Sequence, residues 1–141
     1  MTKGKILSLD FGDRRVGVAI SDLDKEVAFP RDVLTIKKMS DLLNEIRSLC
    51  HAESVVKIVL GLPIEMDGTW GERAKKTEAF RKKLEAAIPG IEIEYFDERL
   101  TSVEAGKILQ EQGYKTHEHK GKIDAIAAQK ILEHYLASRR S

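Results

Sequence analysis

The amino-acid sequence predicts an α/β protein built on a mixed sheet, and three observations support this prediction. Two apolar runs flank a turn that contains glycine and aspartate between Ile6 and Asp22, which is typical of an antiparallel β-hairpin. Further along, strand-like segments alternate with segments of helical periodicity, as in parallel strands joined by helices. The length of 141 residues is near the usual size of one domain, so we expect a single domain over residues 1–141.

The composition is typical of a globular protein and excludes several classes. No apolar run approaches the roughly 18 residues that a membrane span needs, and the N-terminus lacks the features of a secretory signal. We therefore expect a cytoplasmic protein with no membrane partner. The single cysteine, Cys50, excludes an internal disulfide, and its apolar neighbours predict a core position. A net charge of +1 neither supports nor excludes a nucleic-acid partner, so the clustering of charges matters more.

The first half of the chain predicts two or three antiparallel strands, a helix and a buried strand. The hairpin places Asp10 at the end of its first strand. The segment Val27–Leu34 can add a short third strand, which Pro30 restricts to an edge of the sheet. Apolar residues after Ser40 follow helical spacing, with Ser40 as the cap. The almost continuously apolar run Val55–Leu60 predicts a central, parallel strand covered on both faces.

The second half predicts one more strand and three more helices. A long helix from about Gly71 to Ile88 precedes a second parallel strand, Ile91–Phe96. A capping box opens a helix from Thr101 to about Gln112. Residues 113–121 have the composition of a polar surface loop, and a final helix from about Lys122 to Ala137 completes the domain.

Acidic residues gather at one end of the predicted sheet. Asp10 ends one strand, and Asp97 with Glu98 ends another, where open α/β sheets bind ligands. Asp124 shares a helical face with Ala127, Ala128, Ile131 and Tyr135, which should pack on the sheet. A carboxylate in such a place needs a partner, a proton or a metal. Two simpler interpretations stay open: Asp10 starts a turn, or Asp124 stabilises the start of its helix.

Three converging carboxylates repel one another unless cations lie between them. Oxygen ligands suit Mg²⁺ or Mn²⁺, and two such ions roughly 4 Å apart stabilise the attacking and leaving oxygens of phosphodiester cleavage. The pattern therefore predicts two-metal phosphodiester hydrolysis. His117 and His119, two residues apart in a polar segment, are more typical of exposed side chains than of a zinc site.

Four segments of the chain resemble the YqgF (RuvX) family, in order and over essentially the whole length. They are Leu9–Asp22, Gly61–Thr69, Asp97–Ser102 and Ile123–Ala128. The resemblance implies an RNase H-like fold: a mixed five-stranded sheet with an antiparallel N-terminal hairpin, flanked by about four helices. Members are described as Holliday junction resolvases and, more often, as nucleases that mature the precursor of small-subunit ribosomal RNA.

The resemblance also implies the site residues and the cofactor. It assigns the catalytic and metal-binding roles to Asp10, Glu98 and Asp124, with Mg²⁺ or Mn²⁺ as a two-ion cofactor. The chain departs from RuvC-type resolvases, whose second acid ends the strand paired with the first strand. Here that strand ends at Gly61-Leu62-Pro63, so Glu98 must reach across from the next strand.

A second departure concerns the number of acids. RuvC-type resolvases carry two acids three apart on the last helix, whereas Gly121 and Ala127 flank Asp124 at that spacing. Asp97 is then the only other nearby acid that could act as a metal ligand. Strand alternation directs Asp97 and Glu98 to opposite faces, and the family pattern favours Glu98.

Basic residues supply the candidate nucleic-acid surface. They cluster on the helix after Thr69 and around the last loop: Arg73, Lys75, Lys76, Arg81, Lys82, Lys83, Lys115, Lys120 and Lys122. The residues that we expect to contact nucleic acid are Arg14, Arg73, Lys76, Arg99 and Lys122. Alternatives remain open: a solvated helix face for Lys82 and Lys83, an ion pair for Arg99, and core packing rather than base stacking for Trp70.

Three functions are compatible with these features. The first is a metal-dependent nuclease acting on structured RNA or branched DNA, with ribosomal precursor particles as potential partners. The second is a nucleotide phosphotransferase or ATPase, because an Asp-x-Gly hairpin also binds phosphate and metal in actin-like kinases, although those proteins need two such domains. The third is a non-catalytic module associated with ribosomes or nucleic acid. Symmetric cutting of a junction would require a homodimer, whereas RNA processing is possible for a monomer.

Overall fold

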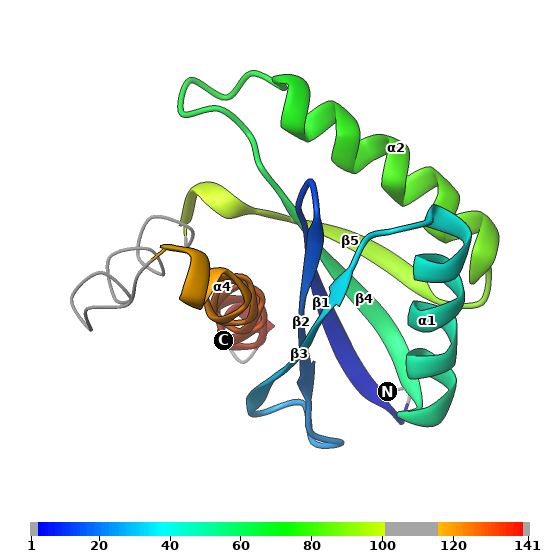
Figure 1. Cartoon of the computed structure of the whole chain (residues 1–141). Helices are drawn as coiled ribbons and strands as arrows, with labels where there is room; N and C mark the ends of the chain where they lie inside the picture. The colour runs from blue at the N-terminus through cyan, green and yellow to red at the C-terminus, as the bar shows by residue number, and fades with distance from the viewer. Residues whose placement is uncertain (1–2, 101–115, 140–141) are drawn as a thin grey trace.

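A computed structural model describes residues 3–100 and 116–139, with side chains from residue 123 onward in the second range. Its centre is a five-stranded mixed sheet with the strand order β3-β2-β1-β4-β5 (Figure 1). The first three strands are antiparallel, and β1, β4 and β5 are parallel. The strands are β1 (Lys5–Phe11), β2 (Arg15–Ser21), β3 (Ala28–Thr35), β4 (Val55–Leu62) and β5 (Glu92–Asp97). The predicted mixed sheet, its N-terminal hairpin and the edge position of the Pro30 strand are confirmed.

The described residues contain three α-helices and a short 3₁₀ helix. They are α1 (Met39–Ala52), α2 (Glu72–Ala87), η1 (Glu98–Leu100) and α4 (Thr116–Arg139). The helix predicted for Thr101–Gln112 lies outside the described residues. In these parts of the chain, no helix has the length and apolar character that crossing a membrane requires.

Two predictions about helix ends are wrong. Ser40 does not cap α1, because the helix begins at Met39 and the preceding Lys38 makes no side-chain capping hydrogen bond. The polar segment 113–121 is not a loop throughout, because α4 already begins at Thr116. Extending an existing helix through polar residues and one glycine costs only about 1 kcal/mol at the glycine. The packed part of α4 can therefore continue through Gly121.

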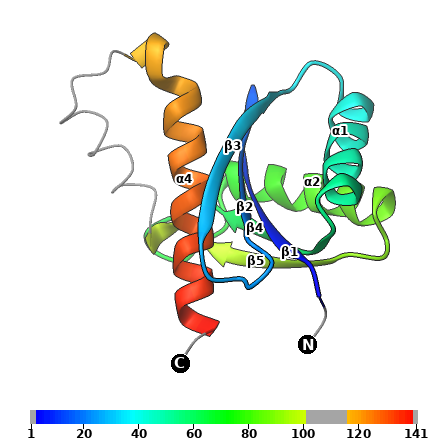
Figure 2. The ribbon, with the colours of Figure 1, turned by 90° about the horizontal axis from the view of Figure 1, so that it is seen from below.

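The two faces of the sheet are covered differently (Figure 2). Helices α1 and α2 pack on one face, where the alternating residues Leu7 and Leu9 of β1 join the larger core cluster. Helix α4 lies on the other face, where Ile6 of β1 joins a second cluster with residues of α4. Strand alternation places Asp10 on the α4 face together with Ile6. The hairpin therefore directs its aspartate toward the last helix.

Helix α4 approaches β1 and β2 closely because the strands present small residues to it. The Ser8 hydroxyl of β1 donates a hydrogen bond of 2.7 Å to the carbonyl of Ala128. A Cβ atom on Gly17 of β2 would lie only 2.1 Å from the carbonyl oxygen of Asp124. Gly17 is also the residue paired with Asp10 across the hairpin. This glycine therefore lets the backbone at Asp124 lie beside the partner strand of Asp10.

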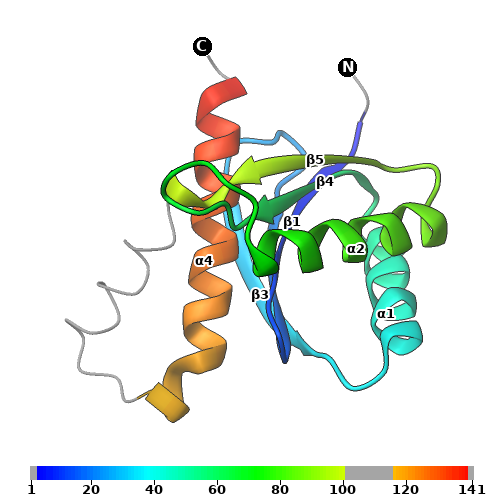
Figure 3. The same ribbon diagram turned by 90° about the horizontal axis from the view of Figure 1, so that it is seen from above.

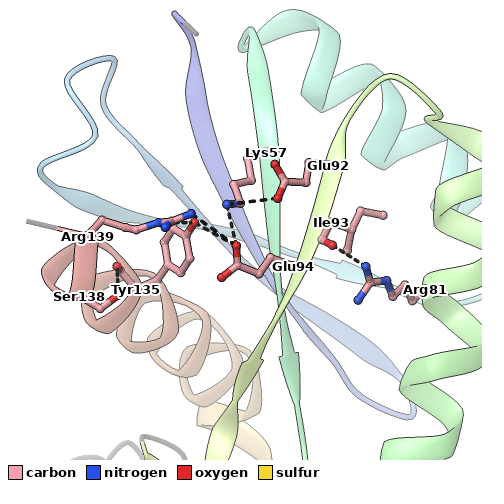
Figure 4. A network of polar contacts seen from close by, with 8 residues as sticks. All are labelled: Lys57, Arg81, Glu92, Ile93, Glu94, Tyr135, Ser138 and Arg139. Carbon is pink, nitrogen blue, oxygen red and sulfur yellow. Dashed lines mark hydrogen bonds and ion pairs between the residues drawn. The ribbon is translucent and has the colours of Figure 1, made fainter. Parts of the chain in front are cut away.

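A polar network fixes the opposite end of α4 to the sheet (Figure 4). The ammonium group of Lys57 on β4 pairs with Glu94 of β5 at 2.7 Å and with Glu92 at 3.5 Å. From α4, Arg139 donates a hydrogen bond of 2.9 Å to the Tyr135 hydroxyl, and its guanidinium lies 3.6 Å from Glu94. The helix is thus held at both ends, which fixes its register along the sheet.

We expect Gly17→Ala to destabilise the protein by about 2 kcal/mol, because the added methyl group meets backbone that cannot move aside locally. Urea unfolding followed by circular dichroism measures the change. Gly90→Ala is the matched control, because a Cβ atom at Gly90 would meet no atom of the described residues within 4 Å. Equal stability of the two variants would contradict the close approach of α4.

Candidate metal and nucleic-acid site

Two acidic side chains from different strands meet across the strand between them. Asp10 lies near the end of β1, and Glu98 is the first residue of η1, directly after β5. Strand β4 separates them, and a Cβ atom at its Gly61 would lie 3.0 Å from the Glu98 carboxyl carbon. The space left by Gly61 is therefore filled by the side chains of Ile131 and Glu98, of which Glu98 is only 6% exposed. The absence of an acid at the end of β4 is what allows Glu98 to reach Asp10.

The two carboxyl groups hydrogen-bond to each other, which requires one of them to carry a proton. Burial, followed by the negative charge of Asp10, raises the pKa of Glu98 to about 9. Burial also raises the pKa of Asp10, and the nearby Asp124 carboxylate adds to this effect. The guanidinium of Arg73 acts in the opposite direction on both pKa values. Among the described residues, Asp10 Oδ1 is buried and has no hydrogen-bond partner.

Asp124 lies near enough to Asp10 to raise its pKa, but it is held by a different partner. The Arg15 guanidinium donates a hydrogen bond of 2.8 Å from Nε to Asp124 Oδ2, and both side chains are about a quarter exposed. The expectation that this carboxylate needs a partner is therefore met by Arg15. The alternative, that Asp124 stabilises a helix start, is wrong because α4 begins at Thr116. Within residues 3–100 and 123–139, no three His, Cys, Asp or Glu side chains form a ready metal-binding group.

Arg15 is the site residue that the sequence analysis missed. The prediction favoured Arg14, which lies in the hairpin turn and is exposed. Arg15 begins β2 and alternates in phase with Gly17 and Ala19, the small residues on the face that α4 covers. This phase could have identified Arg15 as the basic residue directed toward the final helix.

Asp97 and Arg99 pair with each other rather than with the buried acids. The Arg99 guanidinium binds the Asp97 carboxylate with an Nη2–Oδ2 distance of 2.6 Å. The hydrogen bond from Arg99 lowers the pKa of Asp97. The structure thus shows the ion pair for Arg99, and it leaves Glu98 as the acid that contacts Asp10.

The basic residues of α2 divide into two groups. Arg73 lies close enough to influence both buried acids, and Lys76 is exposed beside the hairpin, with its ammonium 3.6 Å from Asp13. Arg81 instead donates to the carbonyl of Ile93 at 2.6 Å and covers the ring of Tyr95 at 4.4 Å. Arg73 thus acts on the buried acids and Lys76 lies beside the hairpin turn, whereas Arg81 stabilises the contact of α2 with β5. Lys122 lies in α4, but its side chain is outside the described part of the chain.

Trp70 is neither fully packed in the core nor fully free to stack on a base, the two alternatives that the sequence left open. Its side chain is 39% exposed, and its ring makes an edge contact with Tyr95 at a centroid distance of 5.8 Å. The residue is anchored on β5 and still accessible to a ligand.

Comparison with known proteins identifies the family. The profile of the RuvX family, described as Holliday junction resolvase, matches residues 4–138. The chain belongs to the RuvX family. A relative from Chloroflexus aurantiacus is 40% identical over 96% of the chain and 88% of its own length. A relative from Crocosphaera subtropica is 38% identical over the whole chain and 98% of its own length. Both carry the name "Putative pre-16S rRNA nuclease".

Solved structures show that this RuvX chain shares the fold of junction resolvases. RuvC of T. thermophilus in complex with a Holliday junction substrate aligns with a TM-score of 0.61 at 13% identity, over 98% of this chain and 96% of RuvC. The Fowlpox virus resolvase in complex with Holliday junction DNA aligns with a TM-score of 0.57 at 12% identity, over 97% and 99% of the two chains. The predicted RNase H-like fold class is confirmed.

The acids of this RuvX chain fit a divalent cation in their chemistry. All the candidate ligands are carboxylate oxygens, which suit Mg²⁺ or Mn²⁺. Asp10 Oδ1 is buried without a hydrogen-bond partner among the described residues, which is the environment that a bound cation would satisfy.

We expect Glu98→Gln to stabilise the metal-free RuvX protein at pH 8 by about 1–3 kcal/mol. The unfolded chain releases the Glu98 proton near the usual pKa of 4.5, whereas the folded protein retains it up to about 9. The stability of the folded protein therefore falls as the pH rises through this range. Glutamine keeps a hydrogen-bonding group and does not titrate. Urea unfolding in EDTA at pH 5 and pH 8 measures the difference.

Asp97→Asn is the control, for which we expect a change in stability of the opposite sign. Arg99 lowers the pKa of Asp97, so the stabilisation by this carboxylate is present at pH 8 and is lost as the pH falls through its folded pKa. We expect Asp97→Asn to be less stable than the wild type at pH 8. A Glu98→Gln variant that is also less stable at pH 8 would contradict the shared proton.

Proposed function

We propose that this chain is a single-domain, metal-dependent nuclease that hydrolyses phosphodiesters in structured nucleic acid. Its principal substrate is the precursor of small-subunit ribosomal RNA, of which it matures the 5′ end. The observation that carries the proposal is the buried Asp10–Glu98 pair at the carboxyl ends of β1 and β5. The name of the two relatives described above, which are 40% and 38% identical, supports the choice of RNA.

Asp10, Glu98 and Asp124 are the residues that would hold Mg²⁺ or Mn²⁺ in a two-ion site. Such ions supply an activated water and stabilise the charge that develops on the phosphate oxygens. The protein contributes the positions: β1 and β5 bring Asp10 and Glu98 together, and the α4–β2 contact brings Asp124 beside them. Arg15 compensates the charge of Asp124 while no cation is bound.

Arg14, Arg73 and Lys76 would bind substrate phosphates next to these acids. Arg73 and Lys76 are three residues apart and share one face of α2, close to the hairpin turn that contains Arg14. A shallow groove of about 310 Å³ continues along this face, with Phe11, Phe80 and Lys83 among its lining residues. Lys122 is a further candidate, whereas Arg99 would have to share its guanidinium with Asp97 to reach a phosphate.

Holliday junction resolution is the second candidate function. The description of the family and the fold similarity to resolvases favour it. It would require two copies of the chain to cut two strands symmetrically. A non-catalytic role in binding ribosomes or nucleic acid is the third candidate, and the loss of function in an active-site variant would exclude it.

We expect Asp10→Asn to reduce Mg²⁺- or Mn²⁺-dependent cleavage by at least about a hundredfold, because a buried ligand of the ions is lost. The assay follows purified protein acting on a fragment of precursor ribosomal RNA and, separately, on a four-way DNA junction. Asp32→Asn is the matched control, because Asp32 is exposed on the edge strand β3. Unchanged cleavage by Asp10→Asn would refute the nuclease proposal.

The same variant distinguishes the substrates in cells. In cells depleted of the protein, wild-type and Asp32→Asn genes should restore mature small-subunit ribosomal RNA 5′ ends, and Asp10→Asn should not. Normal 5′ ends without any functional copy would favour the DNA junction as the substrate. Full complementation by Asp10→Asn would favour the non-catalytic role.

We expect Lys76→Ala to weaken RNA binding and to reduce its salt dependence. Loss of one phosphate contact should make the slope of log K against log salt less steep by about 0.7–0.9. Fluorescence anisotropy at several salt concentrations measures this slope. Lys82→Ala is the matched control, because Lys82 is equally a lysine of α2 but lies on another face of the helix. Equal slopes for the two variants would contradict the assignment.

A further inference from the structure

The segment between β4 and α2 forms a tight loop held by its own hydrogen bonds. We call residues 63–71 the β4–α2 loop. The Glu65 amide donates to the Thr69 carbonyl at 2.9 Å, and the Gly68 amide donates to the Glu65 carbonyl at 2.8 Å. Asp67 Oδ1 accepts hydrogen bonds from the Thr69 amide and hydroxyl at 3.0 and 2.7 Å. Gly68 has a φ of +88°, which favours glycine. The loop therefore presents its side chains on a fixed backbone.

This ordered loop exposes apolar side chains instead of burying them. Met66 at its tip is 79% exposed and Trp70 is 39% exposed. Leu100 of the neighbouring η1 is 62% exposed. Large apolar side chains that gather on a surface beside a site are typical of binding positions. Met66 contributes little to the core at this exposure, so the fold alone gives no reason for an apolar residue there.

The β4–α2 loop lies against the segment that carries a buried acid (Figure 3). A Cβ atom on Gly68 would lie 3.8 Å from Arg99 Nη1, and the negative charge of Asp67 acts on Arg99. Arg99 follows Glu98, the residue that contacts Asp10. Met66 and Trp70 therefore belong to a loop that lies against Arg99, and Leu100 follows Glu98 by two residues. Arg73, only three residues after Trp70, adds a cation that acts on both acids.

We propose that Met66 and Leu100, supported by Trp70, bind an unstacked base of the substrate next to the cleaved phosphodiester. Methionine and leucine side chains are among the apolar wedges that enter between bases, and indole rings stack on bases. The cations Arg73 and Arg99 flank the apolar group, which suits the phosphates of the same strand. The proposal rests on the nuclease function and defines its substrate further: nucleic acid with unpaired nucleotides at the cleavage position, rather than continuous duplex.

Fluorescence of 2-aminopurine tests this proposal. The probe is an RNA stem-loop with a single-stranded 5′ extension, in which 2-aminopurine replaces one base at a time across the boundary between extension and stem. Asp10→Asn protein with Mg²⁺ is used so that the RNA stays intact. We expect increased fluorescence at one or two adjacent positions, and we expect Met66→Ala in the same background to abolish the increase. Met66→Ala should also weaken binding of this RNA at least about fivefold.

Leu23→Ala is the matched control, because Leu23 is also highly exposed, at 61%, but lies in the distant turn between β2 and β3. We expect it to leave fluorescence and affinity unchanged. A fully paired duplex should bind the Met66→Ala and parental proteins equally. If Met66→Ala retains both the fluorescence change and the RNA affinity, the proposal is wrong and a protein partner becomes the candidate for this surface.

A different result is expected if the nuclease proposal itself is wrong. In that case, Asp10→Asn would leave cleavage by the otherwise unmodified protein unchanged, whatever the fluorescence shows. Trp70→Ala provides a second variant, with its folding checked by circular dichroism because Trp70 also contacts Tyr95. Loss of the fluorescence change in both Met66→Ala and a folded Trp70→Ala protein supports the base contact, and its retention in Met66→Ala overturns it.

Discussion

The contact between the Asp10 and Glu98 carboxyl groups is the constraint around which this domain is arranged. Two acids on non-adjacent strands can meet only if the strand between them leaves room, and Gly61 provides that room. Their burial is unfavourable for two negative charges, so the pair retains a proton to a pH at which isolated carboxylates have lost it. A domain selected for stability alone would gain by replacing one of the acids. The pair therefore supports the proposal that these acids hold a ligand.

The position of α4 depends on small residues at one end and on charges at the other. Gly17 lets the helix backbone at Asp124 approach the hairpin, and Ser8 anchors the helix at Ala128. The Lys57 and Arg139 contacts fix the far end of the helix on β4 and β5. Sliding by one turn would move Asp124 by about 5 Å and would separate it from Asp10. The polar network thus serves the acid site although it lies at the other end of the sheet.

The sequence predicted the strands and their directions because hydrophobic alternation and continuous apolar runs depend on local burial. It also predicted that Asp124 needs a partner, a proton or a metal, because helical periodicity placed this acid on the buried face. It did not identify Arg15, because an arginine next to another arginine has no distinguishing local pattern and its role follows from the packing of α4. The start of α4 was missed for a similar reason: residues 116–121 have weak helical preference, and the packed remainder of the helix decides their conformation.

The same acids need different compensation depending on whether a cation is present. In the metal-free protein, a proton compensates the Asp10–Glu98 pair, and the Arg15 guanidinium compensates Asp124. Both compensating groups can be displaced. The proton can be released to water, and the partly exposed Arg15 side chain can rotate away. A buried cation site made of three unpaired carboxylates would instead repel itself and destabilise the fold until an ion arrived. The proton and Arg15 thus allow the domain to fold without a cation, while the acids of the proposed metal site stay close together.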